Sequence, residues 1–353
     1  MKKFLSISLI CAVLFMPSNS LFATSNDVSF FDALGNFTAI EDHKLIQSFY
    51  GNAEFEEYGD HISADYRISI SSVVDEGNRK DSSSRLSAFL KLTNHSEVND
   101  STPFKEMTVQ ANGEIIAKNQ EEFYFKLNNF NIGLTEPLPF AVVDIENAKA
   151  SVDLYRGIWY HTTAAELSYS EFEEEIDLEK YIELEEKLKE EPKQAIIELS
   201  ELALYDSGEA FTTEEIENFI EAISLALKTQ LFTERDVVSG YNLGFKFFNL
   251  NKGEILNLVA QIAKVFNEEM TTSDEEEIRA ALSKVSISGI YRVEDVFHVI
   301  DNLLVRLKLR EVGPLLNFEM NYRYKLSDIN KENSVKAPSE FEEWISPYET
   351  EEF

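Results

Sequence analysis

The chain has 353 residues, of which 64 are acidic and 32 are basic, so its formal net charge at pH 7 is −32. A surface this acidic repels nucleic acid and anionic membrane surfaces, and neither is expected as a partner. Cys11 is the only cysteine, so a chain cleaved beyond it would form no disulfide and offer no thiolate ligand or cysteine nucleophile.

Residues 1–23 have the three parts of a secretory signal peptide. Two lysines precede the apolar run 4–16, and residues 17–20 break the helix before a stretch of small residues. We predict cleavage after Ala23, with Ser20 as the alternative site. An uncleaved membrane anchor is the other interpretation, but the apolar run is shorter than the roughly 20 residues that span a bilayer.

The exported chain is predicted to be soluble, in the periplasm or outside the cell. Leu9 and Ile10 precede Cys11 where a lipoprotein would have small residues, so no lipid anchor is expected. No second apolar run reaches membrane-spanning length. Because residues 1–23 hold two lysines and no acidic residue, their removal leaves 30 basic residues against 64 acidic ones.

From residue 61 the apolar residues alternate with polar ones, as in β-strands that have one wet face. The clearest run is 62–71, and Gly113 predicts a turn or bulge after the third run. The predicted strands in this half are 62–71, 85–93, 104–110, 121–134 and 152–162. Residues 27–46 lack a clean period, and we expect a short helix or a docking strand there.

The pattern then becomes helical. A Glu-rich central helical segment is predicted over 170–231, and it includes an amphipathic helix over 213–231. After a strand at 237–248, Asn251 starts a second amphipathic helix that extends to Met270. Ser273 and Glu276 predict a capping box for a third helix.

Three strands follow the helices. The first is predicted at 285–293. In the second, apolar Leu303, Val305, Leu307 and Leu309 alternate with Leu304, Arg306, Lys308 and Arg310. In the third, Phe318, Met320, Tyr322, Tyr324 and Leu326 alternate with Glu319, Asn321, Arg323, Lys325 and Ser327. Residues 339–353 form an acidic tail.

This order of strands, helices and strands predicts a single α+β domain over 24–338. The predicted architecture is a curved antiparallel β-sheet with helices on one of its faces. Two tandem domains are the alternative, because the length would accommodate them.

No sequence motif predicts catalysis, a cofactor or a metal. The five histidines lack the i, i+4 spacing of a zinc helix, and neither a Gly-x-Ser-x-Gly elbow nor a phosphate-binding Gly-rich loop occurs. The carboxylate clusters are interpreted as solvated helix faces, since the spaced Asp/Asn-Gly loop of an EF-hand is missing. We therefore predict that the protein is not an enzyme.

Two short motifs of the C-terminal part are distinctive. They are Gly157-Ile158-Trp159-Tyr160 and the ending Ser327-Asp328-Ile329-Asn330-Lys331 with Val335-Lys336-Ala337-Pro338. With the order of elements over 151–338, they resemble the Gly-x-Trp-Tyr strand and the final strand of a family of bacterial envelope proteins, the LolA-like and LprG/LppX-like superfamily. The resemblance implies an incomplete barrel, a strongly curved antiparallel sheet with helices covering its concave face, around an apolar cavity that holds lipid chains.

We therefore expect a non-enzymatic extracytoplasmic protein that binds a lipid or another hydrophobic ligand. The predicted cavity wall is aromatic and aliphatic, and consists of Phe245, Phe247, Ile262, Phe266, Tyr322 and Tyr324. The alternative is an envelope interaction module, in which the same side chains fill an ordinary core and the acidic surface meets a protein partner.

Overall fold

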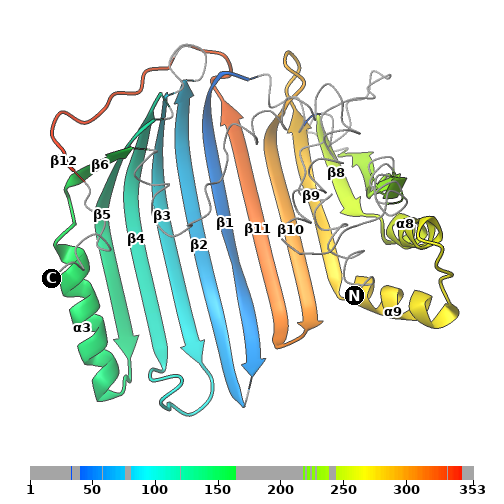
Figure 1. The fold of residues 1–353 in the computed structure, drawn as a ribbon, viewed down its shortest axis with the longest axis horizontal. Coiled ribbons are helices and arrows are strands. Elements are labelled where there is room, and N and C mark those ends of the chain that lie inside the picture. The colour runs from blue at the N-terminus through cyan, green and yellow to red at the C-terminus, as the bar shows by residue number, and fades with distance from the viewer. Residues whose placement is uncertain are drawn as a thin grey trace. The chain divides into compact units, whose positions relative to one another are not determined.

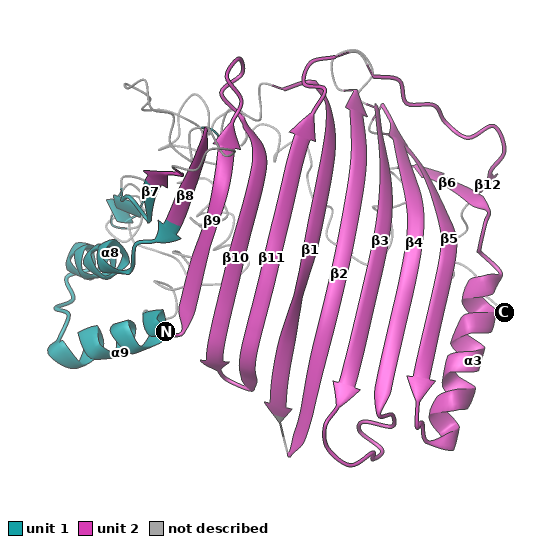
Figure 2. Ribbon diagram, turned by 180° about the vertical axis from the view of Figure 1, so that it is seen from behind, with its two compact units in different colours: residues 1–36, 174–234, 249–283 teal, residues 37–173, 235–248, 284–353 magenta. Residues whose placement is uncertain are grey.

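The computed structural model describes residues 40–57, 59–75, 81–119, 121–163, 229–237, 244–331 and 333–343, with isolated residues at 33, 218, 221, 222, 225 and 226. The chain forms two compact units, and Figure 2 shows both. The first unit comprises 1–36, 174–234 and 249–283, and the second comprises 37–173, 235–248 and 284–353. The predicted signal peptide and residues 238–243 of the predicted strand 237–248 lie outside the described residues. So does the central helical segment, apart from a few residues such as Ala222 and Ala226, which are helical.

One large, open β-sheet dominates the second unit (Figure 1). Its strand order is β12-β6-β5-β4-β3-β2-β1-β11-β10-β9-β8-β7, and the unit boundaries fall within β7 and β8. The strands are β1 (Asp42–Glu57), β2 (Asp60–Asp75), β3 (Asp81–Asn94), β4 (Glu106–Lys118), β5 (Glu122–Thr135), β6 (Trp159–Thr163), β7 (Phe232–Asp236), β8 (Phe245–Leu250), β9 (Val285–Val293), β10 (Ile300–Val312), β11 (Leu315–Ser327) and β12 (Glu342–Glu343). The short β12 pairs with β6 in parallel, whereas strands β1 to β6 and β9 to β11 pair antiparallel. The sheet is therefore mixed and unclosed.

Strand β1 joins the N-terminal and C-terminal halves of the sheet. Phe49 pairs with Ile68 of β2 on one side and with Tyr322 of β11 on the other. The sequence did not predict a long strand here, because Gln47 and Gly51 interrupt the apolar alternation. Gly51 is required by close packing: a Cβ at this position would lie 1.8 Å from the Glu319 carbonyl oxygen.

The meander β2 to β5 confirms the predicted run of strands. The structure also confirms the irregularity at Gly113, where the β4–β5 register shifts between Asn112 and Gly113. The predicted strand 152–162 is wrong in its first residues, which belong to helix α3 (Pro139–Asp153). Pro139 opens this helix, where its missing N–H costs nothing. Helix α3 contacts strand β5.

The first unit contains the two described helices that follow β8. Helix α8 (Lys252–Val265) begins as predicted, since the Asn251 side chain accepts a hydrogen bond from the Glu254 N–H at 3.3 Å. Helix α9 (Thr272–Ser283) is capped differently from the prediction. Thr271 and Asp274 exchange the capping-box hydrogen bonds, at 3.0 and 3.2 Å, two residues before the predicted pair Ser273 and Glu276.

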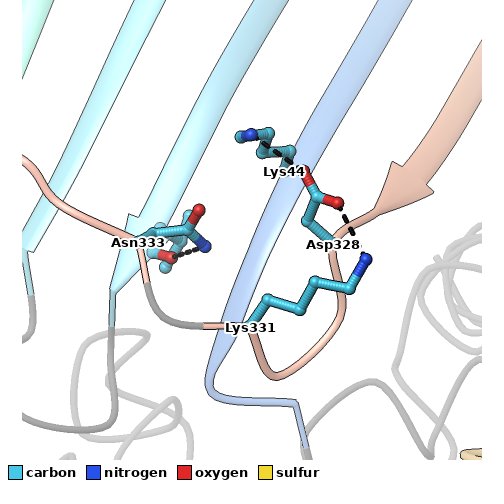
Figure 3. Close-up of polar contacts among 5 residues, drawn as sticks. Lys44, Asp328, Lys331 and Asn333 are labelled. Carbon is cyan, nitrogen blue, oxygen red and sulfur yellow. Dashed lines mark hydrogen bonds and ion pairs between the residues drawn. The ribbon is translucent and has the colours of Figure 1, made fainter.

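The segment after β11 is tied to the start of β1 by polar contacts (Figure 3). The Asp328 carboxylate accepts from Lys44 at 2.8 Å and from Lys331 at 3.2 Å, and the Lys44 hydrogen bond is the main cause of its lowered pKa. Further along, the Asn333 amide donates to the Val74 carbonyl at 3.2 Å. The segment therefore crosses the ends of β1 and β2 on its way to β12.

Candidate functional site

One face of the sheet is apolar across eight adjacent strands. Directly paired residues place their side chains on the same face, so the registers of β5-β4-β3-β2-β1-β11-β10-β9 define this face. We call it the apolar face. Its central members are Phe125, Phe130, Ile132, Val109, Ala111, Ile115, Leu86, Ala88, Leu90, Leu92, Ala64, Ile68, Ile70, Leu45, Phe49, Ala53, Phe318, Met320, Tyr322, Tyr324, Leu303, Val305, Leu307, Ile287 and Tyr291. With strands about 4.8 Å apart, it is about 34 Å wide.

The opposite face carries cross-strand ion pairs. Glu319 contacts Arg306 at 2.6 Å and Lys308 at 2.9 Å, and Glu106 contacts Lys91 at 2.8 Å. Hydrogen bonding from Lys308 is the largest cause of the lowered pKa of Glu319. Charged side chains that pair across strands are typical of a face turned to water. The two faces therefore differ sharply in polarity.

The most accessible part of the apolar face lies on β2, β3 and β4. Ile68, Leu86 and Ile115 are between 36% and 47% exposed. The registers place small residues among them, because Ala88 pairs with Ile68 on one side and with Ala111 on the other. Large apolar side chains thus surround a row of short ones at the centre of the exposed part.

Tyrosine hydroxyls are among the few polar groups on this face. Tyr322 stacks on Phe49, with ring centroids 4.7 Å apart, and its hydroxyl accepts from the Gln47 amide at 2.9 Å. Burial raises the pKa of Tyr66, Tyr322 and Tyr324 above the ordinary value of 10.0. These hydroxyls therefore stay neutral at physiological pH and place no charge on the apolar face.

One end of the apolar face is covered by the chain itself. Ile40, Val299 and Leu326 form a buried cluster there, and Leu45 and Tyr324 pack against it. The cluster lies where β1 begins and β11 ends. The apolar face is therefore more accessible at the middle of the strands than at this end.

The structure brings together only part of the predicted cavity wall. Tyr322 and Tyr324 are neighbours on the apolar face of β11. Phe245 lies under the Arg292 guanidinium at 5.5 Å, and Phe247 lies under Arg235 at 4.7 Å. The other two members belong to the first unit, where Ile262 is buried in α8 and the half-buried Phe266 caps it.

Phe248 lies on the apolar side of the sheet, where the sequence pattern had placed Phe245 and Phe247. Its ring lies 6.1 Å from that of Tyr291, and both residues are fully buried. A Cβ on Gly289 would lie 2.6 Å from the Phe248 ring, so glycine leaves the space that this ring fills. The signal was present in the run Phe245-Lys246-Phe247-Phe248, where either alternation places a phenylalanine on each face.

Sequence reasoning did not name the exposed centre of the face. Ile68 was recognised as one side of an alternating strand, but Leu86, Ala88, Ala111 and Ile115 carried no separate signal. Alternation within each strand identifies its apolar side. Which strands lie next to each other, and which part stays exposed, depends on pairing between distant segments.

The described ranges contain few side-chain clusters that could support catalysis or metal binding. The Ser63 hydroxyl and the His95 Nε2 are 2.8 Å apart, and the His61 ring lies 4.7 Å from that of His95. Within the described part of the chain, no carboxylate accepts a hydrogen bond from the His95 ring to orient it as a general base. The same ranges contain no group of three or more His, Cys, Asp or Glu side chains that could hold a metal ion.

No family model matches the sequence, and no curated protein matches it at a significant level. Among the described residues, no helix has both the length and the apolar character needed to cross a membrane.

Proposed function

We propose that this is an exported, non-enzymatic protein that binds a lipid or another hydrophobic ligand on the apolar face of its sheet. The observation that carries the proposal is the continuity of this face across eight strands, with its accessible centre at Ile68, Leu86 and Ile115. Export to the periplasm or the extracellular space, without a lipid anchor, rests on the pattern of residues 1–23.

The physical basis is the free energy of burying apolar surface. A contiguous exposed apolar patch larger than a few hundred square ångströms is rare on a protein unless something binds to it. Each methylene group that an acyl chain buries contributes about 0.8 kcal/mol. An acyl chain laid across the short side chains Ala88 and Ala111 would contact Ile68, Leu86 and Phe130 around them.

The resemblance to LolA-like proteins supports the same proposal. In that arrangement the sheet curves around the ligand and helices cover its concave face. Tyr322 and Tyr324 remain proposed wall residues, and the fully buried Phe248 and Tyr291 pack beyond them on β8 and β9. The ligand contributes no chemistry in this function, and the protein acts by shielding it from water.

The test compares two adjacent substitutions on β3. Leu86→Glu places a charge at the exposed centre of the apolar face, and Ser87→Glu places the same charge on the opposite face. We expect Leu86→Glu to weaken the binding of a fluorescent fatty acid about tenfold or more, equivalent to about 1.4 kcal/mol. Ser87→Glu should leave binding within about twofold, and circular dichroism should show that both variants are folded.

A second variant blocks the face by volume instead of charge. Ala88→Trp fills the row of short side chains and should also reduce uptake of the fluorescent fatty acid. Equal binding by the wild type and all three variants would contradict the proposal. If the wild type takes up no fatty acid and carries no lipid when purified from its host, the interaction module becomes the better interpretation.

A further inference from the structure

Helix α3 contacts the sheet through a narrow stripe of side chains. It lies beside strand β5 in Figure 1, and Ala141 is its buried residue. Ile145, Lys149 and Val152 are half-buried, and they follow Ala141 at i+4, i+8 and i+11. This spacing forms one face of a helix, so the remaining circumference of α3 faces away from the contact.

The opposite side of α3 carries a second apolar stripe that is exposed. Phe140 is 46% exposed, Val143 is 54% exposed, and Leu154, at the end of the helix, is 71% exposed. With Asn147 and Ala150 they occupy i, i+3, i+7, i+10 and i+14. This is the a/d repeat of a helix that packs lengthwise against another helix, and Asn147 lies at a central a position.

Acidic side chains flank the exposed stripe on both sides. Asp144 lies at an e position, and Glu146 and Asp153 lie at g positions, all of them exposed. Asp153 pairs with Arg156 at 3.3 Å. In a pair of two identical α3 helices, these carboxylates would face carboxylates, which is unfavourable. A partner helix with basic flanking positions would be complementary.

We propose that the exposed stripe of α3 is a docking surface for an amphipathic helix of another protein. The partner helix has an apolar seam, which packs on Phe140, Val143 and Leu154. It carries Lys or Arg beside that seam, opposite Asp144 and Glu146. Asn147 fixes the register, since a polar residue at an a position of a helix pair favours one alignment over its alternatives. The surface is separate from the apolar face of the sheet.

The probe is a synthetic heptad-repeat peptide with Leu at a and d and Lys at e and g, and its counterpart carries Glu at e and g. The Lys peptide should bind the full-length protein, as measured by fluorescence anisotropy, and the Glu peptide should not. Val143→Lys should weaken binding about tenfold or more. Ala148→Lys adds the same charge at an exposed position of α3 outside the stripe and should change binding less than about threefold. Leu86→Glu, on the sheet, should leave peptide binding unchanged.

Four results would overturn the inference. The first is no binding of the Lys peptide at concentrations up to about 100 μM, equivalent to about 5.5 kcal/mol of binding free energy. The second is equal weakening by Val143→Lys and Ala148→Lys, which would show an attraction of charge alone. The third is a dimer in sedimentation that Val143→Lys dissociates, which would make a second copy the occupant. The fourth is binding of phosphatidylcholine vesicles that depends on Val143, which would make a membrane the occupant.

Discussion

At the residue scale, one buried ion pair holds the C-terminal segment to the sheet. Asp81, at the start of β3, is fully buried and contacts the Lys118 ammonium group. Lys118 also donates to the Val335 carbonyl at 3.0 Å, and the Asn119 N–H donates to Asp81 at 3.1 Å. Val335 in turn packs in a buried cluster with Ile116 and Tyr124. One charged pair thus joins β3, β4 and the segment that leads to β12.

Asp81→Asn is expected to lower the free energy of unfolding by about 3 kcal/mol. The physical reason is that the mostly buried Lys118 would lose the charge that compensates it. Glu106→Gln is the matched control, because it removes a carboxylate from the more exposed pair with Lys91 and should cost less than about 1 kcal/mol. Urea denaturation measures both, and equal losses would contradict this account.

The buried histidine of β1 predicts a pH dependence of stability. Burial lowers the pKa of His43 below the ordinary value of 6.5, and the charge of Asp42 offsets this only in part. Below pH 6.5 the His43 imidazole therefore binds a proton more readily in the unfolded chain than in the folded chain. The contribution of His43 to stability is thus full above pH 6.5 and is lost as the pH falls below it.

Melting temperatures between pH 7.5 and 5.5 test this prediction. The wild type should lose stability over this interval more steeply than His43→Gln, which has no proton to gain at that position. Carboxylates with lowered pKa values, such as Glu319 and Glu114, also lose stabilising contacts on acidification, but at lower pH. Parallel profiles for the two proteins would show that His43 does not contribute.

At the element scale, the pairing of β9 with β10 depends on a glycine. A Cβ on Gly289 would lie 2.1 Å from the Leu304 carbonyl oxygen and 2.6 Å from the ring of Phe248. Gly289→Ala must therefore displace the strand, the ring or both, and should cost about 1–3 kcal/mol. Gly253→Ala, in the first turn of α8, is the control. The Cβ added there would lie 3.7 Å from the Asn251 side-chain oxygen, which is an ordinary van der Waals contact.

Thermal or chemical denaturation measures the two alanine variants. Gly253→Ala should be neutral or stabilising by up to about 1 kcal/mol, since alanine favours the helix more than glycine. Loss of stability in both variants would show that the close contact at Gly289 is not the cause.

Single elements also show what local patterns predict. The strands 285–293, 303–310 and 318–327 were predicted, the last two with their alternation, and the registers confirm that Leu303, Val305 and Leu307 share a face with Tyr322 and Tyr324. Helix α3 was not predicted, because its apolar positions form two opposite stripes and leave no single amphipathic face. Its low amphipathicity is the property that now suggests a second docking surface.

At the scale of the whole molecule, polarity is divided between the two faces of one sheet. Charged pairs such as Arg306–Glu319 lie on one face, and a continuous apolar surface lies on the other. The net charge of −32 accompanies this division. A net charge of this size favours solubility, and the apolar face is the surface on which the proposed ligand would bind.

The sequence alone predicts export and a lack of disulfides, and it determined the strand-rich composition and the side of each later strand that is apolar. These follow from local composition and from a period of two, which each segment carries by itself. It also located the start of α8, because a capping side chain acts on its own first turn.

Only the tertiary structure decided which strands are neighbours and which apolar residues meet. The placement of β1 between β2 and β11 brings Phe49 beside Tyr322, although 273 positions separate them in the chain. The same pairing separates Tyr322 and Tyr324 from Phe245 and Phe247, which pack under arginines. Long-range registers are set by hydrogen bonds and packing between distant segments, and those partners are not encoded in the local pattern of either segment.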